Sequence, residues 1–171
     1  MPDSIRSFFE RQMKLANGGG EAAGSATADA EPAARARAEA ERSKLHLAAC
    51  ALLLELAYAD DEFTPDERLH IEAVLRRHFD LDADTARELM ALAEEERSSA
   101  VDLYQFTSLI RSSYDLGQKT LLAEIMWGLI LSDGEIARHE AYMLRKIANL
   151  LDLEPGYLSA ARKRAGEGPG V

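Results

Sequence analysis

The sequence is poor in the residues that are typical of disulfide-stabilised, β-rich or membrane-spanning proteins. Its single cysteine excludes an intramolecular disulfide. It has only 5 prolines and 6% aromatic residues, while Ala, Leu, Glu and Arg are abundant, which favours helices over strands. The longest apolar stretch, residues 47–59, contains Glu55 and is shorter than the roughly 20 apolar residues of a spanning helix. We therefore expect an all-α domain that does not cross a membrane.

Positive charge is also scarce. The chain has 20 Lys and Arg against 30 Asp and Glu, which gives a formal net charge of -10. An acidic surface repels phosphate backbones, so we expect no nucleic-acid partner. The first residues lack the apolar core and cleavage site of a secretory signal, which predicts a cytoplasmic protein.

The chain divides into four parts. Residues 1–15 place Ile5, Phe8, Phe9 and Met13 on one face of an amphipathic helix. Residues 16–31 resemble a flexible linker, 32–164 form the helical domain, and 165–171 form a disordered tail. The N-terminal helix has three open readings: it docks on its own domain, contacts another protein, or binds peripherally to the inner face of a membrane. A homodimer is also open, and the protein partner is not identified.

Hydrophobic spacing and capping residues predict the helices of the domain. The first extends from about Ala33 to Ala59, and Asp102 and Asp115 are the expected N-caps of two later helices. The other expected helices are 65–78, 83–97, 103–113, 116–131, 137–150 and 155–164. Trp127 and Cys50 are expected in the core, and residues 94–96 (EEE) at a solvated helix end.

An internal repeat is predicted by a shift of 73 residues, which aligns 52–74 with 125–147. Asp60 then aligns with Asp133, and Glu67 with Glu140. Stepping along each helix in turns of four places these four acids on the faces that carry the apolar stripes. Inward-facing carboxylates are costly unless a cation or a base compensates them. Ligation by oxygen alone suits Ca²⁺ first, with Mg²⁺ or Mn²⁺ as alternatives.

Other readings of these acids stay open. Thr64, Pro65 and Glu67 fit a capping box, which would explain Glu67 without a metal, whereas no capping residue stands three before Glu140. Arg76, Arg145 or Lys146 could instead neutralise the acids. A weaker alternative is a di-iron carboxylate enzyme, because Glu67 and His70 form one Glu-x-x-His pair, although the second repeat lacks the matching histidine.

Residues 59–67 (ADDEFTPDE) and 132–140 (SDGEIARHE) resemble the doubled motif of the TerB-like (tellurite resistance protein B) family, an Ala-Asp-Gly with a Glu seven residues after the Asp. The resemblance covers about residues 44–164. It implies a bundle of about seven helices with pseudo-two-fold symmetry and a divalent-metal site made by Asp60, Glu67, Asp133 and Glu140. Asp61 stands where the motif has Gly and is a further candidate ligand.

Taken together, these features predict a non-enzymatic TerB-like module with a divalent-cation site, acting in tellurite or stress-response assemblies. The alternative is a metal-free protein-interaction domain whose acids cap helices and pair with Arg.

Overall fold

The structure, a computed structural model, describes residues 30–100, 102–132 and 138–167, and this part of the chain is all helical with no strands. Its elements in order are α2 (Ala30–Ala57), the 3₁₀ turn η1 (Tyr58–Asp60), α3 (Pro65–His78), α4 (Ala83–Ser99), α5 (Tyr104–Ser113), α6 (Leu116–Leu131), α7 (Arg138–Leu150) and α8 (Pro155–Glu167). The predicted all-α class is confirmed. The predicted N-terminal helix 1–15, most of the linker 16–31 and the last four residues lie outside the described residues.

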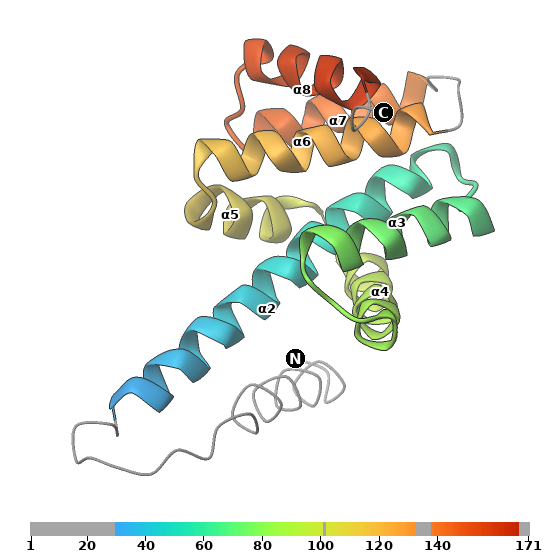
Figure 1. The fold of residues 1–171 in the computed structure, drawn as a ribbon. Helices are drawn as coiled ribbons and strands as arrows, with labels where there is room; N and C mark the ends of the chain where they lie inside the picture. Colours follow the sequence, from blue (N-terminus) through green and yellow to red (C-terminus); the bar gives the residue numbers. More distant parts are fainter. Residues whose placement is uncertain (1–29, 101, 133–137, 168–171) are drawn as a thin grey trace.

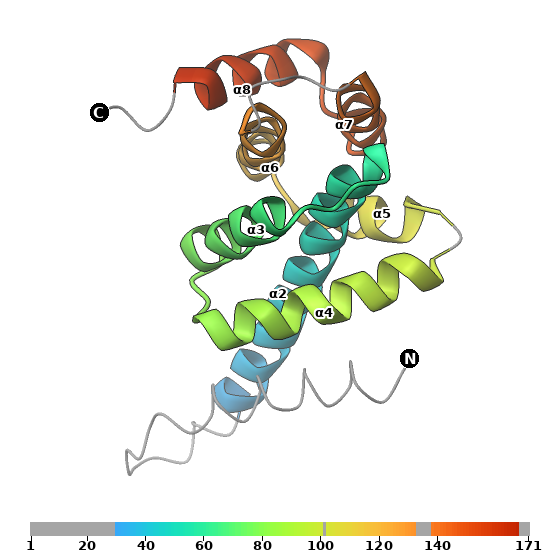
Figure 2. The same ribbon diagram turned by 90° about the vertical axis from the view of Figure 1, so that its right-hand side faces the viewer.

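Helix α2 is the central element of the fold (Figure 1). Its C-terminal half packs against α4 and α5, and it also contacts α3, α6 and α7. Helices α6 and α8 pack against each other on the other side of the molecule (Figure 1), and Figure 2 shows α8 crossing above α6, which is seen nearly end-on. From Pro32 to Arg42 the side chains of α2 are exposed or half-buried, and this half extends beyond the bundle.

The core follows from the apolar stretches of the sequence. Within 47–57 every side chain except the half-buried Glu55 is buried, and on α6 the largest buried side chains include Met126, Trp127 and Leu129. Cys50 is fully buried and Trp127 is 7% exposed, so both are core residues as expected. No helix in the described part of the chain is long and apolar enough to span a membrane.

A capping aspartate sets the start of α6 as predicted, but the start of α5 differs from the prediction. Asp115 accepts a hydrogen bond from the backbone N–H of Gln118 (2.8 Å), and the Gln118 side chain accepts from the N–H of Asp115 in return. The expectation for Asp102 was wrong by one position: α5 starts at Tyr104 and its N-cap is Leu103. Asp102 still accepts a hydrogen bond from the N–H of Tyr104 (2.9 Å), because its side chain reaches into the first turn.

The predicted repeat has matching features in the two halves. Glu67 and Glu140, which are 73 residues apart, lie in the first turns of α3 and α7, and both are buried. Each helix is followed by an aspartate in the left-handed backbone conformation, Asp80 (φ 54°) and Asp152 (φ 56°). The two align when one residue is deleted, which also places residues 79–82 (FDLD) over 151–154 (LDLE). These correspondences favour the repeat, which stays a prediction.

Candidate functional site

The first acidic motif begins where α2 gives way to η1. Asp61 has φ 64° and its N–H donates to the carbonyl of Tyr58 (3.1 Å), which closes the turn. An aspartate tolerates this left-handed conformation better than most residues other than glycine, which explains how Asp61 replaces the glycine of the motif. The Asp60 carboxylate accepts a hydrogen bond from the N–H of Glu62 (3.1 Å).

The prediction that Asp60 points inward was wrong, because Asp60 is exposed, as is Asp61. The prediction extended the α-helical spacing of residues 53–57 by one more turn. The α-helix ends at Ala57, however, and the tighter 3₁₀ turn rotates the following side chains away from that face. Helical phase therefore does not determine the direction of Asp60.

Glu67 is buried, with 3% of its surface exposed, in the first turn of α3. Its Oε2 accepts hydrogen bonds from the backbone N–H (2.7 Å) and the hydroxyl (2.9 Å) of Thr64. The Thr64 hydroxyl oxygen accepts from the N–H of Glu67 (3.2 Å). This completes the predicted capping box, and Pro65 occupies the first position, where its missing N–H costs nothing. Capping therefore accounts for at least one oxygen of Glu67.

Glu140 occupies the equivalent position in the first turn of α7 and is also 3% exposed. The two predicted inward-facing glutamates are therefore both buried. Helix α7 contacts η1, so the turn that carries Asp60 lies beside the helix that carries Glu140. Asp133, the fourth predicted ligand, lies outside the described residues.

The described residues do not bring three potential His, Cys, Asp or Glu ligands into one group. Within this part of the chain, none of the ion pairs joins Glu67 to Arg76, Arg145 or Lys146. Arg145 instead donates through Nε to the carbonyl of Ala141 (3.1 Å). The expected Arg pairing is thus not found for Glu67.

His46 and Cys50 are of residue types that often bind metals, but both have structural roles in this fold. His46 stacks on Phe79, with ring centroids 4.4 Å apart and an interplanar angle of 1°. Burial, with a contribution from the charge of Arg42, lowers the pKa of His46 from 6.5 to about 4. Burial also raises the pKa of the Cys50 thiol, so Cys50 is a core residue rather than a reactive thiol.

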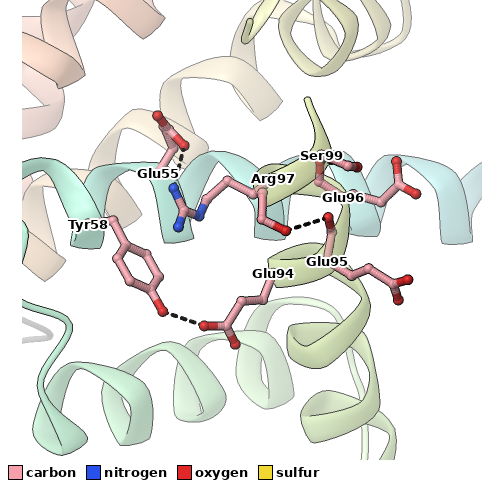
Figure 3. Close-up of polar contacts among 8 residues, drawn as sticks. Glu55, Tyr58, Glu94, Glu95, Glu96, Arg97 and Ser99 are labelled. Atoms are coloured by element: carbon pink, nitrogen blue, oxygen red, sulfur yellow. Dashed lines mark hydrogen bonds and ion pairs between the residues drawn. The ribbon is translucent and has the colours of Figure 1, made fainter. Parts of the chain in front are cut away.

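A polar cluster that the sequence did not predict lies beside the first motif (Figure 3). The Tyr58 hydroxyl donates to Glu94 on α4, and the Arg97 guanidinium lies 3.9 Å from the Tyr58 ring centroid. Arg97 also pairs with Glu55 (3.2 Å), and Arg68 on α3 pairs with Glu94 (3.4 Å). The expectation of a solvated 94–96 was therefore wrong for Glu94, which is half-buried and bridges two helices.

This Tyr58 cluster (Glu55, Tyr58, Arg68, Glu94 and Arg97) fixes the end of α2 against α3 and α4. The hydrogen bond to Glu94 is the largest cause that raises the pKa of Tyr58, followed by burial. The tyrosine therefore stays protonated and keeps its donor at neutral pH. The sequence could have indicated only the α4 part of this cluster, because Glu94 and Arg97 are three residues apart and therefore lie on one face of the helix.

The fold and its buried glutamates define an all-α module in which Glu67 lies in the first turn of α3, after α2, and Glu140 lies in the first turn of α7, after α6. A comparison with family models assigns this class more closely: the model of the tellurite resistance protein TerB matches residues 46–163, about two thirds of the chain. The chain belongs to the TerB family, as its doubled motif predicts. No curated protein and no solved structure matches it.

Proposed function

We propose that this protein is a TerB helical module that binds one divalent cation and acts as a non-enzymatic adaptor in a stress-response assembly of the tellurite-resistance type. The proposed ligands are Asp60, Glu67, Asp133 and Glu140, with Asp61 as a fifth candidate. Ca²⁺ is the first candidate cation, followed by Mg²⁺ and Mn²⁺, because all the donors are hard oxygens. The family is in general a non-enzymatic helical domain, which supports the adaptor role.

The contact between η1 and α7 is the observation that carries this proposal. It joins the acidic turn of the first motif to the helix in which the second motif ends. Glu67 and Glu140 are both 3% exposed, so a cation held by their carboxylates would be shielded from water, which strengthens electrostatic attraction. A carboxylate can keep a backbone hydrogen bond on one oxygen and offer the other to a cation.

Thermal unfolding of metal-stripped protein, titrated with each cation, tests the proposal. A cation at 100 times its Kd should stabilise the wild type by about 2.7 kcal/mol. The Asp60→Asn/Asp133→Asn double variant should lose this shift, since its two neutral side chains bind a hard cation weakly. Asp66→Asn, at an exposed acid in the first turn of α3, is the matched control and should keep the shift. An equal shift in the double variant, or no saturable shift in wild type, would contradict the proposal.

The Thr64–Glu67 capping box favours a second candidate function, a metal-free protein-interaction domain in which these acids stabilise helix starts. In that case no cation changes the melting temperature. The variant Glu67→Gln, whose amide oxygen can still accept the Thr64 hydrogen bonds, then unfolds like the wild type with or without metal.

A further inference from the structure

An open groove of about 490 Å³ lies between the middle of α2, the end of α3 and the start of α6. Its apolar lining includes Ala38, Leu45, Phe79, Leu121, Leu122 and Ile125. Leu121 is 43% exposed, so part of this apolar side chain is open to water in the groove. Glu41 and Asp80 place negative charge at the rim, beside Arg42. The groove combines an apolar floor with a charged rim, as helix-binding grooves do.

The chain itself contains a segment with matching chemistry. Ile5, Phe8, Phe9 and Met13 follow the spacing of one helical face, and the sequence predicts an amphipathic helix for 1–15. Arg6, Arg11 and Lys14 outnumber the acids of this segment, whereas the whole chain has a net charge of -10. The segment is thus apolar on one face with a net charge of +1 (Arg6, Arg11 and Lys14 against Asp3 and Glu10), whereas the rest of the chain is acidic.

The connection between the two is long enough. Residues 16–29 join the segment to Ala30, the first described residue of α2. A flexible chain of this length has a root-mean-square span of about 20 Å and a maximum reach of about 48 Å. The groove begins at Ala38, only about 12 Å along the axis of α2 from Ala30. Such a tether gives an effective concentration in the millimolar range, far above that of a second molecule in dilute solution.

We propose that residues 1–15 dock as a helix in this groove of their own chain, with the phenyl rings of Phe8 and Phe9 against Leu121 and Ile125. Docking removes the exposed part of Leu121 from water and places Arg6 or Arg11 near Glu41 and Asp80. The same groove is then closed to other helical partners until the segment is displaced. The N-terminal segment is thereby an intramolecular competitor for a binding surface of the TerB module.

Hydrogen exchange of the full chain provides the first test. Amides of residues 5–13 should be protected in wild type, and the protection should be lost in the groove variant Leu121→Glu and in the segment variant Phe8→Asp/Phe9→Asp. Two matched controls should keep it: Tyr142→Glu, at an exposed aromatic on α7 outside this groove, and Ser7→Asp, on the opposite face of the predicted helix. Unprotected amides in wild type, or protection that survives Leu121→Glu, would overturn the proposal.

A spin label distinguishes docking within the chain from docking on a second copy. Because Cys50 is fully buried, Gln118→Cys at the rim of the groove provides one accessible thiol. The attached nitroxide should broaden the signals of residues 5–13 in the same ¹⁵N-labelled chain, and a label at Tyr142→Cys should broaden them less. Broadening that is also seen when ¹⁵N-labelled unmodified chains are mixed with unlabelled spin-labelled chains, and that disappears on dilution, would show a dimer contact and overturn the intramolecular proposal. Equal broadening from both label sites would also overturn it.

Discussion

The first turns of α3 and α7 present the same buried glutamate in two different local settings. In α3 the glutamate follows Thr64 and Pro65, and it closes a complete capping box. In α7 the residue three before Glu140 is Ala137, which has no hydroxyl to take the part of Thr64. Both glutamates are nevertheless 3% exposed. Both helices therefore have a buried glutamate in the first turn, although only α3 is preceded by a threonine that can complete the capping box.

The Thr64 hydroxyl completes the capping box of α3, whereas the sequence has no hydroxyl at the matching position before Glu140. The cation site proposed above would use both glutamates, and η1, which carries Asp60, contacts α7, which carries Glu140.

The largest expected effect concerns the cores of the two halves. Leu56→Ala and Leu129→Ala change residues 73 positions apart that are 0% and 1% exposed. Each should lower the free energy of unfolding by about 2 to 5 kcal/mol, because each removes buried methyl groups and leaves a cavity. Leu69→Ala, at 63% exposure, should change it by less than about 0.5 kcal/mol. Urea unfolding measures all three, and a loss confined to one half would contradict structural equivalence.

The next effect is a pH dependence that only the first half should show. His46 stacks on Phe79, whereas Lys119 and Leu151 stand at the corresponding positions of the second half. The pKa of His46 is about 4 in the folded protein, whereas its ordinary value, expected in the unfolded chain, is 6.5. The unfolded state therefore binds the proton more readily. Neutral His46 therefore contributes to the free energy of unfolding above pH 6.5. As pH falls from 6.5 to about 4, the free energy of unfolding should decrease by roughly 3 kcal/mol.

The variant His46→Phe keeps the stacked ring and should flatten the stability profile between pH 6.5 and 4 in urea unfolding. His139→Phe, at an exposed histidine on α7, is its control and should leave the wild-type slope. A His46→Phe profile as steep as that of wild type would show that other groups cause the acid sensitivity.

A smaller effect is expected when the first motif is made to resemble the second. Thr64→Ala gives α3 the alanine that precedes α7 and removes the hydroxyl from the capping box. The loss should be about 1 kcal/mol by thermal unfolding. Thr64→Ser should keep most of the stability, and Ser159→Ala, at an exposed serine of α8, should be neutral. A neutral Thr64→Ala would show that Glu67 does not depend on its cap.

Local signals in the sequence predicted the helices well but not the packing between them. Pro65 and Asp115 set helix starts through their own backbone and side-chain chemistry, and the structure has both helices where these residues predict them. Asp60 was misplaced because the change from α to 3₁₀ geometry after Ala57 has no clear sequence signal. The Tyr58–Glu94 contact joins residues 36 positions apart and depends on how α4 crosses α2, which local spacing does not encode.

Of the candidate site, the sequence correctly predicted the burial of Glu67 and Glu140, since both continue apolar stripes at helical spacing. The capping of Glu67 was also predicted as an alternative, because Thr64-Pro65-Asp66-Glu67 has the residue types that the box requires. Cation binding by these acids stays a prediction.

Isothermal titration calorimetry with Ca²⁺ on wild type, Glu67→Gln and Glu140→Gln tests the central claim most directly. Glutamine at position 67 keeps an acceptor for Thr64 but removes the charge that binds a cation. A site shared by the two motifs predicts one cation per chain in wild type and at least a tenfold loss of affinity, about 1.4 kcal/mol, in each single variant. A shared site would be contradicted by two cations per chain in wild type and one in each variant. It would also be contradicted by unchanged binding in both variants.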